Sequence, residues 1–186
     1  MANSKRNRQD REKKSPQPPS PAQPAQKQDI IELFTKADML AQEGDLAKVQ
    51  ALYTDWLALN PGHPFAHAAL FNLGCSQLNT APETAERTLR EVLRRQPEFL
   101  QGHYNLGVVL ERLGRDEETL DCWARLTALP DTVAGQEREL LLMALNQSGR
   151  LLERLKRLHQ AELALERSLR LDPAQPKVIH HWVHLR

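Results

Sequence analysis

Glycines and prolines punctuate this chain at regular intervals, and the apolar residues between them follow helical spacing. The third interval is the clearest, with Gly107 inside one apolar segment, Gly114 in the turn after it and Pro130 after the next segment. Proline ends a helix because it lacks an amide donor, whereas glycine permits tight turns and close helix approach. The unit is therefore a helix, a turn and a second helix, about 34 residues in all.

Four copies of this unit are expected, at residues 30–63, 66–99, 100–133 and 142–175. The second copy is one residue short in its turn, next to Pro82, and the fourth has Lys156 where a turn glycine is expected. Residues 131–141 form an insert that we expect to extend the next helix backwards. Because no helix of about 14 residues is stable alone, the copies must stack into one core. The predicted fold is all-α, an α-solenoid with a final helix at 176–186 that caps the array or begins a junction.

Charge is distributed unevenly along the chain. Residues 1–28 carry seven Lys and Arg against two acidic residues, a net of +5, whereas the whole chain has a formal net charge of +1. The rest therefore holds 18 basic and 22 acidic side chains, a net of −4. Nucleic-acid-binding domains are basic, so we expect no nucleic-acid partner for the folded part.

Residues 1–28 are also rich in proline and have no apolar side chain larger than alanine after Met1. Such a segment cannot offset its ordering entropy by burial, so we predict a disordered tail. Its Pro16 and Pro19 have the P-x-x-P spacing that polyproline-binding domains recognise, and a solvated linker is the preferred alternative. No stretch approaches the ~20 apolar residues that cross a bilayer, and no secretory signal is evident. We expect a cytoplasmic protein with no membrane partner.

Motifs for catalysis are absent from the sequence: there is no glycine-rich phosphate loop, no G-x-S-x-G, no H-E-x-x-H and no C-x-x-C. Cys75 and Cys122 fall in expected helices without a sequence-local base, and we interpret both as free structural thiols in a reducing compartment. His180 and His184 have the spacing of a metal-binding pair, but an amphipathic helix explains them more simply. We therefore predict no catalytic residue, no metal, no cofactor and no enzymatic activity.

One face of each first helix is expected to line the concave surface of the stack, where an extended peptide would lie. The residues predicted for this groove are Phe34 and Asp38 in the first copy, Phe71, Asn72, Cys75 and Asn79 in the second, Tyr104, Asn105, Val108 and Arg112 in the third, and Asn146, Gln147 and Arg150 in the fourth.

Three of these residues form a possible amide ladder. Asn72 and Asn105 stand two positions before a helix glycine, and Gln147 stands in the equivalent place. A carboxamide both donates and accepts hydrogen bonds, so spaced amides can bind an extended backbone without reading its sequence. The alternative is that each amide satisfies a neighbouring backbone group or is solvated in the groove, and both interpretations stay open. For Phe71 and Tyr104, packing is the preferred interpretation.

The third copy, with His103-Tyr104-Asn105-Leu106-Gly107 followed by Leu110, Gly114, Trp123 and Pro130, resembles the tetratricopeptide repeat. The resemblance extends over residues 30–175 with weaker matches in the other copies. It implies a right-handed superhelix that serves as a protein-interaction scaffold and binds a protein or peptide in its groove. Self-association of the array is a further possibility.

The repeats with Asn-Leu-Gly in their first helix, and the segment from Leu171-Asp172-Pro173 through His181-Trp182 to Arg186, are similar to bacterial SPINDLY-type relatives of O-linked N-acetylglucosamine transferases. That resemblance implies an alternative function, the substrate-recruiting module of a protein glycosyltransferase. The sequence contains no domain of the several hundred residues that binding a nucleotide sugar would require.

Overall fold

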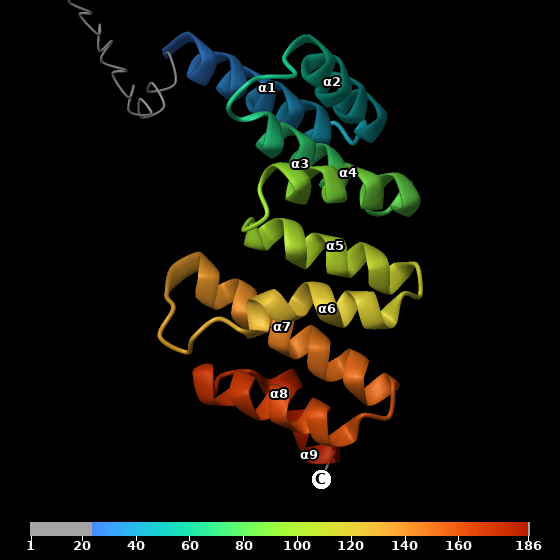
Figure 1. Cartoon of the computed structure of the whole chain (residues 1–186), viewed down its shortest axis with the longest axis vertical. Coiled ribbons are helices and arrows are strands. Elements are labelled where there is room, and N and C mark those ends of the chain that lie inside the picture. Colours follow the sequence, from blue (N-terminus) through green and yellow to red (C-terminus); the bar gives the residue numbers. More distant parts are fainter. Residues whose placement is uncertain (1–23, 186) are drawn as a thin grey trace, which may run out of the picture.

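The structure, a computed structural model, describes residues 24–185, with side-chain surroundings from residue 29 onward. In this part of the chain there are nine helices and no strand (Figure 1). The helices are α1 (Pro24–Gln42), α2 (Leu46–Leu59), α3 (Ala66–Gln77), α4 (Pro82–Arg95), α5 (Leu100–Arg112), α6 (Asp116–Thr127), α7 (Gly135–Arg154), α8 (Leu158–Leu171) and α9 (Pro176–Leu185). The structure confirms the predicted all-α solenoid.

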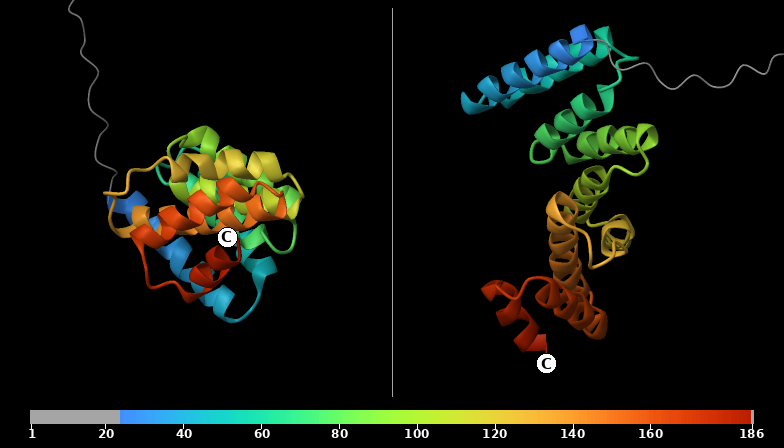
Figure 2. Two further views of the ribbon diagram at one scale, coloured as in Figure 1. Left: turned by 90° about the horizontal axis from the view of Figure 1, so that it is seen from below. Right: turned by 90° about the vertical axis from the view of Figure 1, so that its left-hand side faces the viewer.

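The first eight helices form four pairs that stack along the long axis of the molecule, with α1 and α2 at one end and α8 and α9 at the other (Figures 1 and 2). Buried side chains join consecutive pairs: Ala69 and Leu73 of α3 pack with Val49 and Tyr53 of α2. Similar clusters join the second pair to the third and the third to the fourth. The core is therefore a continuous strip in which each pair is stabilised by its neighbours.

Glycines in the first helix of three pairs set the distance to the second helix. A β-carbon placed on Gly107 would lie 2.2 Å from Nε1 of Trp123, and one on Gly149 would lie 2.5 Å from Cδ2 of Leu165. At Gly74 the nearest atom would be 3.0 Å away, on Leu89. A side chain at position 107 or 149 would occupy the space of the partner residue, so glycine allows these helices to pack this closely, whereas a side chain at position 74 would require a smaller shift of Leu89.

The turn between the paired helices contains a left-handed residue in the first, third and fourth pairs. Gly44 and Gly114 have φ values of 78° and 72°, and Lys156 has a φ of 62° at the corresponding place in the fourth pair. Residues other than glycine rarely adopt this conformation. Lys156, which stands where a turn glycine is expected, therefore has the same left-handed turn conformation as Gly44 and Gly114.

The predicted effect of the insert is confirmed. Helix α7 begins at Gly135 and runs for 20 residues, whereas α5 has 13. Its first turns contact the end of the next helix, where Arg138 donates a hydrogen bond to the carbonyl of Leu171. Arg167 of α8 donates to the carbonyls of Thr127 and Leu129 and so holds the loop that precedes α7.

Two predicted boundaries require comment. Helix α1 begins at Pro24, so the last residues assigned to the tail, 24–28, are helical in the structure. The remainder of the predicted tail, residues 1–23, lies outside the described residues. At the other end, α9 packs on α8 with Val178, Trp182 and Leu185 half-buried. Ile179 and Val183 on its outer side remain 42% and 56% exposed.

Candidate functional site

The first helices of the third and fourth pairs, α5 and α7, border an open hollow of about 450 Å³. Seven residues line it, and we call it the arginine hollow: Tyr104, Val108, Glu111, Arg112, Gln147, Arg150 and Arg154. Five of the seven belong to the predicted groove. The structure therefore brings together residues from two copies that are distant in sequence, as stacking of the repeats requires.

Ion pairs fix the positions of two arginines in this hollow. Glu111, whose side chain is only 14% exposed, accepts hydrogen bonds from Arg150 at 3.0 and 3.1 Å and from Arg154 at 3.1 Å. Arg154 also donates to Asp116 at 2.8 Å. A half-buried carboxylate shared by two guanidinium groups holds both side chains in a defined geometry.

Arg112 is held differently, by two uncharged groups of the second pair. Its Nη1 donates to the carbonyl of Leu78 at 2.9 Å and to Oδ1 of Asn79 at 2.5 Å. Asn79, another predicted groove residue, does not line the hollow but holds Arg112 in place. The positive charge of Arg112 is exposed and is not offset by a carboxylate at these two contacts.

A second hollow of about 350 Å³, the junction hollow, adjoins the first because Gln147 and Arg150 line both. Its other lining residues are Asn146, Leu165, Lys177, Val178 and His181. His181 is hydrogen bonded to Glu153 of α7, which anchors α9 beside this surface. The two hollows form one continuous surface that runs from α5 to the start of α9.

The predicted amide ladder is largely engaged within the fold. Asn72 and the hydroxyl of Tyr53 share a hydrogen bond, and Nδ2 of Asn105 donates to Sγ of Cys75 at 3.1 Å. Gln147 is hydrogen bonded to the Tyr104 hydroxyl. Each amide therefore reaches back to a side chain of the preceding repeat, a kind of partner that neither interpretation of the sequence included. Gln147 also accepts a hydrogen bond from Nε of Arg150 at 3.1 Å, and each of the three carboxamides keeps some donor or acceptor capacity.

Burial accounts for the phenol pKa values at these contacts. Burial is the largest influence on the pKa of Tyr53 and of Tyr104, and it raises both above the ordinary value of 10.0. The hydrogen bonds from Asn72 and Gln147 act in the opposite direction. Both hydroxyls consequently remain protonated at neutral pH and are available as hydrogen-bonding groups.

The remaining predicted residues lie elsewhere or are used in packing. Phe34 packs edge-on against Tyr53, and Phe71 packs edge-on against Phe99 with ring centroids 5.0 Å apart. Asp38 is exposed on α1 and does not line the arginine hollow. Asn146 lines the junction hollow, but its side chain is hydrogen bonded to both Ser168 and Gln175.

Sequence reasoning missed two residues that shape the arginine hollow, Glu111 and Arg154. Both continue helical faces that had been identified, since Glu111 follows Val108 by three residues and Arg154 follows Arg150 by four. Side chains at these spacings are neighbours on one helix face. Extending each predicted face by one turn would have found them.

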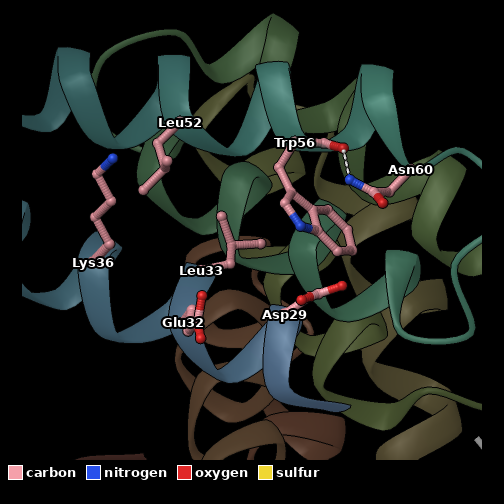
Figure 3. Close-up of a pocket in the computed structure, with 7 residues that line it drawn as sticks. All are labelled: Asp29, Glu32, Leu33, Lys36, Leu52, Trp56 and Asn60. Atoms are coloured by element: carbon pink, nitrogen blue, oxygen red, sulfur yellow. Dashed lines mark hydrogen bonds between the residues drawn. The ribbon is translucent and has the colours of Figure 1, made fainter. Parts of the chain in front are cut away.

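Another hollow, of about 340 Å³, lies between α1 and α2 (Figure 3). Its lining residues are Asp29, Glu32, Leu33, Lys36, Leu52, Trp56 and Asn60, none of which belongs to the predicted groove. The Asn60 side chain donates to the carbonyl of Trp56 at 2.9 Å. This hollow has two carboxylates and one cation, so its charge is opposite to that of the arginine hollow.

The two thiols are poorly suited to nucleophilic chemistry. Burial raises the pKa of both Cys75 and Cys122 from 9.0 to about 11, and neither forms a disulfide in the structure. The thiolate is the reactive form of cysteine, and a raised pKa keeps both side chains in the unreactive thiol form at neutral pH.

The histidine pair of the final helix is close enough for hydrogen bonding. Nε2 of His180 and Nε2 of His184 lie 3.1 Å apart. Within residues 24–185 no group of three or more His, Cys, Asp or Glu side chains is arranged to hold a metal. In the same part of the chain no helix has the length and apolar character of a membrane span.

Two segments match family models of the tetratricopeptide repeat: residues 81–125, from α4 through most of α6, and residues 144–175, which include most of α7 and all of α8. The search of curated proteins found no match. Neither matching model describes a glycosyltransferase, so the similarity to SPINDLY-type proteins gains no support and stays a prediction.

Solved structures with the same fold include repeat proteins from several bacteria. A tetratricopeptide repeat protein from Parabacteroides merdae aligns over 81% of this chain and 56% of its own, with a TM-score of 0.71 and 21% identity. PilF of Pseudomonas aeruginosa aligns over 87% and 69%, with a TM-score of 0.69 and 22% identity. MamA of Desulfovibrio magneticus aligns over 89% and 85%, with a TM-score of 0.68 and 16% identity.

These alignments show a shared fold at low sequence identity. The chain spans little more than half the length of the Parabacteroides merdae protein. Together with the matching family models, they show that the array has the fold of tetratricopeptide repeat proteins and that residues 81–125 and 144–175 are similar in sequence to such repeats.

Proposed function

From the tetratricopeptide repeats that this chain carries, we propose that it is a protein-interaction scaffold that binds an extended segment of a partner protein across α5 and α7. The observation that supports this proposal is the continuous surface formed by the arginine and junction hollows. It is assembled from two repeats and the start of α9, so it exists only in the stacked array. A solenoid presents such surfaces to ligands that are themselves extended.

The surface offers the contacts that an extended segment needs. Tyr104 and Val108 provide apolar area, and Gln147 provides an amide that retains hydrogen-bonding capacity. The arginines supply charged donors at its edge. Affinity is expected to be moderate, because ordering a flexible segment consumes part of the interaction free energy.

A matched pair of double variants tests this proposal. Arg112→Ala/Gln147→Ala alters the arginine hollow, whereas Arg94→Ala/Arg125→Ala alters exposed arginines on α4 and α6 that do not line it. A partner isolated from cell extract on the unmodified chain is then titrated against all three proteins by calorimetry. We expect the first variant to weaken binding by about tenfold or more, which corresponds to ~1.4 kcal/mol, and the second to bind normally.

Hydrogen exchange locates the contact independently of the substitutions. Partner binding is expected to slow amide exchange in α5, in α7 and at the start of α9. Protection confined to α4 and α6, or equal affinity of both double variants, would contradict the proposal. Self-association would appear in the same experiments as a second copy of this chain recovered in place of a different protein.

A further inference from the structure

We infer that the arginine hollow selects acidic segments, so that the partner of this scaffold presents closely spaced Asp or Glu side chains in an extended stretch. The inference rests on the proposed function and specifies its ligand.

Cations outnumber carboxylates along the surface. The two hollows are lined by Arg112, Arg150, Arg154 and Lys177 against one carboxylate, Glu111, a net of +3 with histidine neutral. Two further carboxylates, Asp116 and Glu153, contact Arg154 and His181 without lining either hollow. Including both still leaves an excess of positive charge, in contrast to the net −4 of residues 29–186.

The arginines keep donors free for a ligand. A guanidinium has five N–H donors, and Arg150 uses Nε for Gln147 and Nη2 for Glu111. Arg154 uses Nη1 for Glu111 and Nη2 for Asp116. Because these contacts hold the side chains in place, a ligand carboxylate would meet donors that are already oriented, which lowers the entropy lost on binding.

Arg112 is the group that most clearly favours an acidic ligand. The two groups that accept hydrogen bonds from Arg112, the Leu78 carbonyl and the Asn79 side chain, are neutral and leave its positive charge to be neutralised by a ligand. It lies on α5, whereas Arg150 and Arg154 lie on α7, and all three line the same hollow. Carboxylates on an extended segment that crosses from α5 to α7 would therefore meet cations on both helices.

The charge also discriminates between possible occupants. Residues 1–28 of the chain itself carry a net of +5, so the same electrostatics that attract an acidic segment disfavour binding of this one. The hollow between α1 and α2, with Asp29 and Glu32, has the opposite preference. Acidic partners are consequently directed to the α5–α7 side of the array.

Three fluorescent peptide pools, equal in length and randomised at the same positions, test the inference with the full chain. Their fixed alternate positions are Glu, Gln or Lys. Fluorescence anisotropy at low salt should show binding of the Glu pool roughly tenfold tighter than the Gln pool, with the Lys pool weakest. Arg112→Gln should weaken the Glu pool several-fold, Arg112→Glu should weaken it further, and both should leave the Gln pool unchanged.

The matched control is Arg94→Gln, which removes an exposed arginine of α4 and is expected to change no affinity. Equal binding of the Glu and Gln pools, lost together in Val108→Arg, would overturn the acidic preference while leaving the proposed function in place. Absence of binding by any pool would overturn both. The Arg112 variants are expected to fold, because Arg112 makes only exposed contacts. Circular dichroism of each variant checks this.

Discussion

The third and fourth repeats place two backbone features at corresponding positions, and only one of the two is built from the same residue in both repeats. Gly107 precedes Gly114 by seven residues, and Gly149 precedes Lys156 by the same interval. The helix glycine is present in both repeats and faces a bulky side chain, Trp123 or Leu165. The turn glycine is replaced in the fourth repeat, although the left-handed conformation is retained.

The difference follows from the two kinds of constraint. At the helix glycine the limit is space, because a β-carbon would overlap a partner that is fully buried. At the turn the limit is a backbone conformation that costs a non-glycine residue about 1–2 kcal/mol. No heavy atom lies within 4 Å of a β-carbon placed on Gly114, so a side chain there points into open space. The steric constraint is the stricter of the two.

The largest expected effect is that of Gly107→Ala. The added β-carbon would lie 2.2 Å from Nε1 of Trp123, whose indole is fully buried and donates to the Tyr104 carbonyl at 3.1 Å. Neither the ring nor its hydrogen bond can be kept unchanged, and we expect a loss of about 3 kcal/mol in the free energy of unfolding. Gly149→Ala should cost less, about 2 kcal/mol, since the aliphatic Leu165 adjusts without losing a hydrogen bond.

Urea unfolding followed by circular dichroism measures both losses. Gly62→Ala is the matched control, because a β-carbon at Gly62 meets no heavy atom within 4 Å. Equal stability losses at Gly107 and Gly149 would show that the size of the partner side chain does not set the steric limit.

An intermediate effect is expected at the turns, with opposite signs in the two repeats. Lys156→Gly should stabilise the chain by about 1 kcal/mol because it relieves a left-handed lysine, and Gly114→Lys should destabilise it by about the same amount. The shift of the urea midpoint at constant slope gives both values. If Lys156→Gly has no stabilising effect, the lysine side chain contributes a compensating interaction, and the turn comparison fails.

The features that could be predicted from the sequence are those with local signals. Helix pairs, turns and the lengthened α7 follow from glycine, proline and apolar spacing, which are local signals. The hydrogen-bond partners of the three amides, Asn72, Asn105 and Gln147, could not be predicted. Each partner lies in the preceding repeat: Tyr53, Cys75 and Tyr104, respectively. Which neighbour an amide reaches depends on how two repeats stack, and the sequence of either repeat alone does not contain that geometry.

The arginine hollow shows a similar division. Tyr104, Val108 and Arg112 could be assigned to one helix face by counting residues, and the same holds for Gln147 and Arg150 in the next repeat. The partnership of Glu111 with two arginines of α7 depends on the distance between α5 and α7. Residue spacing along each helix therefore predicted much of the lining of the hollow. The ion pairs that hold its arginines in place depend on how the two repeats pack.

The smallest expected effect on stability comes from the ion pairs that join the third and fourth repeats. Arg154 and Arg157 contact Asp116 and Glu117, and the side chains of both arginines are about half exposed, at 51% and 42%. Solvent screens such pairs, and each contributes about 0.5 kcal/mol or less. Arg157→Gln, which removes the pair with Glu117 and leaves the Arg154–Glu111 pair in place, should therefore lower the free energy of unfolding by about 0.5 kcal/mol or less, and the difference from the unmodified chain should shrink at high salt. Thermal unfolding at two salt concentrations measures it, with Arg170→Gln, which removes an exposed pair within α8, as the control. A loss that exceeds that of Gly107→Ala would show that the joint between these repeats depends on charge more than on its buried side chains.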